Sequence, residues 1–93
     1  SLKNKTFLEQ FVGEYEVMGM TISVSLRGED ILLASVPGQG DVVLEPYQGT
    51  TFNLKGLPGF SLEFVIADGV VTDVKISQPN GTFSGKKRVA ESA

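Results

Sequence analysis

A serine and a lysine near the end of the chain have a spacing that can support nucleophilic catalysis. Ser84 and Lys87 match the pattern S-x-x-K, in which the lysine activates the serine when both lie one turn apart on one helix face. Here the pair follows a turn signal, Asn80-Gly81, and a strand is expected. Side chains alternate between the two faces of a strand, so residues three apart point to opposite faces. We therefore expect no catalytic role for this pair.

The sequence lacks the residue types that most often carry out acid–base or metal chemistry. It contains no histidine and no cysteine, which removes the commonest general base, the commonest metal ligand and thiol chemistry. Glu14 and Glu16 share a strand face, but no acid on a second strand is placed to work with them. We expect them to be solvated side chains. The chain is expected to be no enzyme on its own and to hold no cofactor or metal.

The charge balance argues against a nucleic-acid partner. Eight basic and eleven acidic residues leave a net charge of -3, whereas phosphate binding requires a concentrated basic field. The one basic cluster, Lys86-Lys87-Arg88, is expected to be a solvated strand edge. No segment approaches the ~20 apolar residues of a membrane span.

Three side chains with polar tips are the candidate positions for a ligand or a structural tether. They are Tyr15, Tyr47 and Gln78, each expected to point at least partly inward. A buried polar tip must find a hydrogen-bond partner. It can find one in the protein, as a tether at the barrel mouth, or it can orient a small ligand. Both interpretations stay open.

The chain of 93 residues is expected to form a single domain over residues 1–93, because 41% of its residues are apolar and its length suits one core. A short helix is expected at residues 6–12. Thr6 and Glu9 fit a capping box at its start, Phe7, Leu8 and Phe11 share a face, and a glycine at position 13 would end it.

From residue 14 on, the hydrophobic pattern has a period of two, which is typical of half-buried strands. Asp68-Gly69 and Asn80-Gly81 favour two-residue type I′ turns. Short links join antiparallel neighbours, which gives an up-and-down meander. Eight strands are expected, at residues 14–18, 21–26, 31–36, 41–47, 50–55, 61–66, 73–77 and 82–89.

Closure of this all-β meander into a barrel is expected, rather than two packed sheets, because it removes the two unpaired edges. Eight strands enclose a space that side chains can fill or that can hold one small ligand. Bulky inward residues such as Leu26, Phe52 and Phe64 favour a filled or nearly filled interior over a roomy one.

An ordered series of short motifs resembles the small C-terminal β-domain of serine β-lactamase-related, penicillin-binding-protein-like hydrolases. It opens with Phe11-x-Gly13-x-Tyr15, similar to the aromatic-x-Gly-x-Tyr start of that domain. One departure is Lys86, at a position where that family tends to have a small residue. The series continues through Leu32-Leu33-Ala34, Pro37-Gly38-Gln39, Leu44-x-Pro46, Phe52, Leu62-x-Phe64, Asp68-Gly69-Val70-Val71, Val74, Gln78-x-x-Gly81 and Arg88-Val89.

This resemblance implies a lipocalin-like barrel with an accessory, non-catalytic role. The barrel would shape substrate access, stability or assembly of a parent hydrolase. Its partner would be the catalytic serine-hydrolase domain of the same chain, or a second copy in a homo-oligomer. The parent enzymes are usually exported by bacteria to the periplasm or beyond. The nucleophile lies in the catalytic domain, so no catalytic residue carries over.

Because the sequence does not begin with methionine, we expect a piece of a longer protein, and the resemblance implies that this piece is the C-terminus of a hydrolase. A lipocalin-like module that binds a small apolar ligand is the alternative function.

Overall fold

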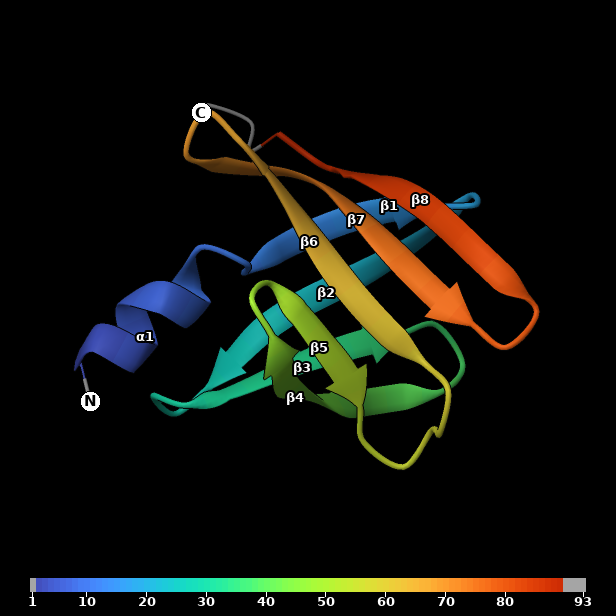
Figure 1. The fold of residues 1–93 in the computed structure, drawn as a ribbon, viewed down its shortest axis with the longest axis horizontal. Helices are drawn as coiled ribbons and strands as arrows, with labels where there is room; N and C mark the ends of the chain where they lie inside the picture. The colour runs from blue at the N-terminus through green and yellow to red at the C-terminus, as the bar shows by residue number, and fades with distance from the viewer. Residues whose placement is uncertain (1, 90–93) are drawn as a thin grey trace.

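The computed structural model describes residues 2–89 as one short helix followed by eight antiparallel strands that close into a barrel (Figure 1). Each strand pairs with the next in sequence order, and β8 returns to pair with β1. The all-β, closed up-and-down architecture predicted from the period of two is therefore confirmed. The elements are α1 (Leu2–Glu9), β1 (Gly13–Val17), β2 (Met20–Arg27), β3 (Ile31–Val36), β4 (Gly40–Gln48), β5 (Thr51–Leu54), β6 (Ser61–Ala67), β7 (Val70–Gln78) and β8 (Gly81–Lys87).

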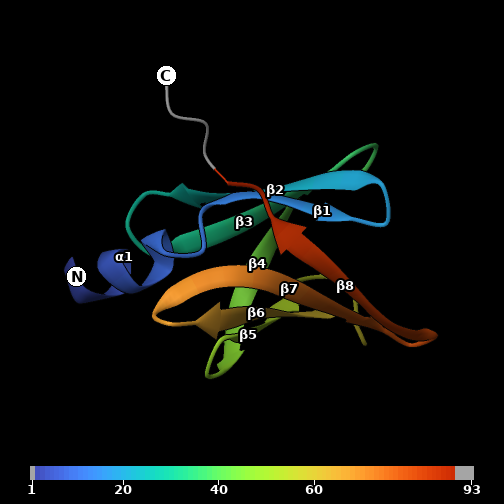
Figure 2. The ribbon, with the colours of Figure 1, turned by 90° about the horizontal axis from the view of Figure 1, so that it is seen from above.

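The helix lies at one end of the barrel, and four hairpin connections lie at the other (Figures 1 and 2). The sequence predicted this helix at residues 6–12, and that position was wrong. The helix ends at Glu9, so Thr6 lies inside it and does not cap it. Phe11 and Val12 follow in a tight turn, with their amides donating to the carbonyls of Leu8 and Glu9 at 3.1 and 3.2 Å. The turn directs Phe11 into the barrel, where it is fully buried.

Two of the hairpin turns show how local conformation sets strand register. Asp68 and Gly69 both have positive φ, 53° and 77°, as a type I′ turn requires. The predicted turn at Asn80-Gly81 was wrong by one residue: Pro79 and Asn80 form the turn, and Gly81 already pairs with Gln78. The proline fixes a negative φ, which excludes a type I′ turn there.

An aromatic cluster fills the half of the barrel next to α1. Phe11, Phe52, Phe64 and Tyr15 are each at most 1% exposed. The rings of Phe11 and Phe64 stack with centroids 4.4 Å apart, and Phe52 meets both edge-on at 5.5 and 5.7 Å. Tyr15 lies 5.5 Å from Phe64. Such ring pairs contribute about 0.5–1.5 kcal/mol each beyond their area burial. This aromatic cluster closes the α1 end.

The seam between β1 and β8 closes the barrel, and Gly85 forms one of its three residue pairs, at the Val17 end. Gly85 pairs with Val17 of β1 on one side and with Val74 of β7 on the other. A Cβ atom at Gly85 would run into the Val17 side chain and would lie 2.5 Å from the carbonyl oxygen of Glu16. Real Cβ atoms essentially never come that close to backbone. The close approach of β8 to β1 therefore depends on a glycine at this position.

Replacing Gly85 with alanine is expected to lower the free energy of unfolding by about 1–3 kcal/mol, because the added methyl must displace the backbone of β1. Urea denaturation of the purified chain measures this quantity. Ser84→Ala is the matched control: its side chain is exposed on the same strand, and a change under about 0.5 kcal/mol is expected. Equal stability of the Gly85→Ala variant and the wild type would contradict the proposed constraint.

Candidate functional site

The end of the barrel opposite α1 contains a cavity of about 270 Å³, which we call the open-end cavity. Its lining comes from all eight strands and the loops between them. Met18 and Met20 lie on its rim and are 70% and 45% exposed, so the cavity opens to solvent. Inward-facing side chains form its walls: Val17, Ile22, Ala34, Leu62, Ile76 and Phe83.

No charged side chain within residues 2–89 lines the open-end cavity. The lining consists of aliphatic, methionine, phenylalanine or glutamine side chains. Such a hollow, closed on its sides by a hydrogen-bonded barrel and apolar inside, has the character of a small-molecule site. Its volume lies just below the range of typical ligand pockets, about 300–1,000 Å³, so any ligand must be small.

The position of the hollow follows from where small and large side chains fall along the strands. Ala34 lies between Val24 and Val42 in its row, and Gly85 lies in the seam. The large rings of Phe52 and Phe64 do not line the cavity. The interior is therefore filled in the α1 half and carries the cavity at its open end, because the bulk of the side chains is distributed unevenly along the barrel axis.

Tyr15 acts as a tether inside the aromatic cluster. Its hydroxyl donates to the carbonyl oxygen of Phe11 at 2.8 Å, and both groups are buried. Desolvation raises the pKa of the phenol above its ordinary value. Tyr15 does not line the open-end cavity. Of the two roles considered, tether or ligand contact, the structure supports the tether for Tyr15. Its hydrogen bond holds the turn that follows α1 against β1.

Tyr47 was expected to point at least partly inward, but its side chain points outward. It shares the outer face of β4 with Glu45 and is 66% exposed. It lies at an irregularity in the β4–β5 register, where Pro46 pairs with Phe52 and the next pair is formed by Gln48. Tyr47 is thus remote from the interior, and it has no contact with the cavity.

Gln78 does line the open-end cavity. It is the last residue of β7 and lies on the inner face that also carries Val74 and Ile76. Its side-chain amide makes no hydrogen bond to another residue in the range 2–89. A second glutamine, Gln39 of the β3–β4 turn, also reaches the lining. Sequence reasoning missed Gln39, although its place in a loop between two strands was visible.

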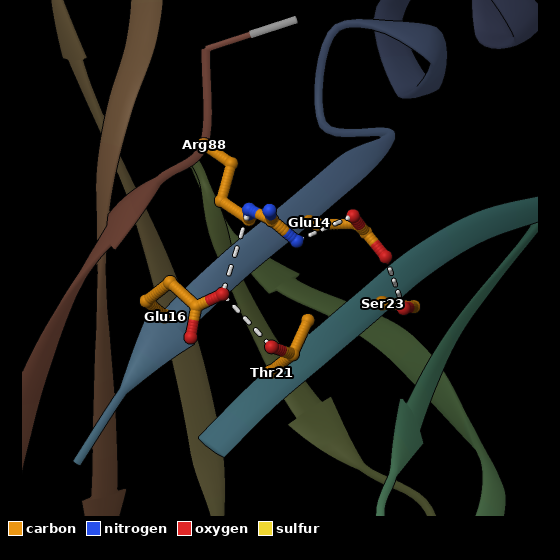
Figure 3. Close-up of polar contacts among 5 residues, drawn as sticks. All are labelled: Glu14, Glu16, Thr21, Ser23 and Arg88. Carbon is orange, nitrogen blue, oxygen red and sulfur yellow. Dashed lines mark hydrogen bonds and ion pairs between the residues drawn. The ribbon is translucent and has the colours of Figure 1, made fainter. Parts of the chain in front are cut away.

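The paired carboxylates of β1 face outward and belong to a surface ion-pair network (Figure 3). Arg88 lies 3.1 Å from Glu14 and 3.5 Å from Glu16, measured from guanidinium nitrogen to carboxylate oxygen. The hydroxyls of Thr21 and Ser23 donate to the same two carboxylates at 2.8 and 3.4 Å. All three charged side chains are about half exposed, and such pairs stabilise by at most about 1 kcal/mol. They connect Arg88, the first residue after β8, to β1 across the seam.

The S-x-x-K pair is separated by the wall of the barrel. Ser84 is exposed and pairs with Lys75, whereas Lys87 pairs with Tyr15 and lies on the inner face. The ammonium of Lys87 donates to the carbonyl oxygen of Gln10 at 3.3 Å. The predicted placement of these two residues on opposite faces is confirmed.

No protein-family model matches this sequence. No curated protein matches it significantly. Within residues 2–89, no helix has the length and apolar character needed to cross a membrane. The same part of the chain holds no group of three or more Asp, Glu, His or Cys side chains placed to bind a metal ion.

The buried phenol of Tyr15 predicts a loss of stability at alkaline pH. Because its pKa is raised in the folded chain, the unfolded chain, with an ordinary tyrosine pKa near 10, loses the proton first. The stabilisation is complete below about pH 10 and is lost as the pH rises further. In a Tyr47→Phe variant, Tyr15 is the one tyrosine left. Its phenolate absorbance is expected to appear only together with loss of the β-sheet circular dichroism signal. Reversible ionisation near pH 10 in a folded barrel would contradict this.

Proposed function

We propose that this chain is a binding module for a small apolar ligand, which enters the barrel through its open end. The observation that carries the proposal is the open-end cavity itself: about 270 Å³ with an uncharged and predominantly apolar lining. Transfer of apolar ligand surface from water into such a lining is favourable by about 25 cal/mol per Å². In this proposal the ligand takes the place that further core side chains would occupy in a filled barrel.

The construction of the barrel supports binding to a preformed site. The aromatic cluster fixes the α1 half, and continuous strand pairing fixes the walls. A ligand would therefore meet walls that already have their bound shape, which limits the ordering cost of binding.

A second candidate is an accessory role as the C-terminal, lipocalin-like barrel of an exported bacterial serine hydrolase related to β-lactamases. It is supported by the ordered motif series from Phe11 to Val89. It is also supported by the exposed methionines on the rim, an apolar surface of the kind that a covering domain buries. In this role the barrel supplies no catalytic group, and the catalytic domain of the same chain is its partner.

Ligand binding is tested with the fluorescent apolar probe N-phenyl-1-naphthylamine. Saturable enhancement of its fluorescence by the wild type is expected. Val36→Trp places a large side chain in the lining at the rim, and it is expected to weaken probe binding by about tenfold or more, which corresponds to 1.4 kcal/mol.

The matched control for this experiment is Ser35→Trp, the neighbouring residue on the opposite face of β3, which should bind like the wild type. Ala34→Met, which fills the cavity from the wall, is a second blocking variant. No probe binding by the wild type, or binding that survives both blocking variants in folded protein, would reject the proposal.

The accessory role is tested in the full-length hydrolase that it assumes. Deletion of this domain is expected to change ester turnover, the thermal unfolding midpoint or the assembly state seen by native mass spectrometry. If all three are unchanged, the accessory role is wrong.

A further inference from the structure

We infer that the ligand of the open-end cavity is an uncharged molecule with one hydrogen-bonding group at its end, and that Gln78 binds this group. The inference rests on the proposed binding function and narrows it. It predicts that the cavity binds neutral amphiphiles, such as alcohols and amides, more tightly than carboxylate amphiphiles of the same length.

The distribution of charge on the chain indicates that the ligand is uncharged. None of the charged residues between positions 2 and 89 lines the cavity. Two members of the chain's basic cluster are engaged elsewhere: Lys87 donates to Gln10 at the α1 end, and Arg88 binds the carboxylates on the outer face of β1. An ionised carboxylate drawn into the cavity beside the half-buried Gln78 would lose part of its water without gaining a cation. Burial of an unpaired charge is far costlier than burial of a neutral polar group.

The position of the two glutamines indicates where the polar end of the ligand lies. Within the described range 2–89, Gln78 and Gln39 are the polar side chains of the lining, and the other lining residues are apolar. Both belong to the open end, one at the last position of β7 and one in the β3–β4 turn. A ligand with its apolar part against Ile22 and Leu62 would thus leave its polar end beside these amides.

The chemistry of the Gln78 amide indicates which ligand groups it can bind. A glutamine side chain offers two N–H donors and one carbonyl acceptor, so it can bind a hydroxyl, an amide or an ester carbonyl without carrying charge. The Gln78 amide is not engaged by any other residue between 2 and 89. A ligand group can bind it without breaking an existing hydrogen bond of the fold.

The test is displacement of N-phenyl-1-naphthylamine by 1-octanol, octanoate and octane at neutral pH. The wild type is expected to require at least about tenfold more octanoate than octanol for half displacement. Gln78→Met keeps the length of the side chain and removes the amide. It is expected to weaken octanol binding about three- to tenfold, the loss of one hydrogen bond, and to leave octane binding unchanged or tighter. Gln48→Met, an exposed glutamine outside the lining, is the control and should match the wild type.

Equal displacement by octanoate and octanol would overturn the inference and leave the binding function standing. So would unchanged octanol binding in folded Gln78→Met. Failure of the probe to bind the wild type would instead reject the binding function, and this inference with it. The two failures are therefore distinguishable in one set of titrations.

Discussion

The close approach of β8 to β1 at Gly85 is the contact on which the rest of the structure depends. The two strands pair through only three residue pairs, and the pair of Gly85 with Val17 leaves no room for a side chain on β8. This pairing places Lys87 opposite Tyr15 and brings Arg88 over Glu14. Without it, β1 and β8 would each present an unpaired edge, and the inner faces of both would be open to water.

Closure creates an interior that is divided along the barrel axis. The α1 half is filled by four aromatic rings, one of them supplied by the turn after the helix and tethered through the Tyr15 hydroxyl. The other half holds the open-end cavity, which is lined mainly by aliphatic, methionine and phenylalanine side chains. The filled half stabilises the fold, and the open half is where the proposed ligand would bind. Because the packed core occupies one half of the interior, a chain of 93 residues can also contain a cavity in the other half.

Local sequence patterns were sufficient to predict most of the fold. The alternation around Ile22 and Leu62 and the Asp68-Gly69 turn identify strands and connections, and the cost of unpaired edges predicts closure. Features set by contacts distant in sequence were not predictable in the same way. Phe11 looks like part of a helix face until the barrel that accepts it is known. The outward direction of Tyr47 and the uneven filling of the interior depend on how all eight strands stack along the axis, which no single segment specifies.

Crystallography under xenon pressure tests the central claim, that the barrel is filled at one end and hollow at the other. Xenon enters apolar cavities and is located directly by its electron density. The account predicts a xenon site between Ile22, Ala34 and Leu62, and no site among the rings of Phe11, Phe52 and Phe64. Side chains packed across the open end, with no xenon between them, would contradict the account and remove the basis for ligand binding.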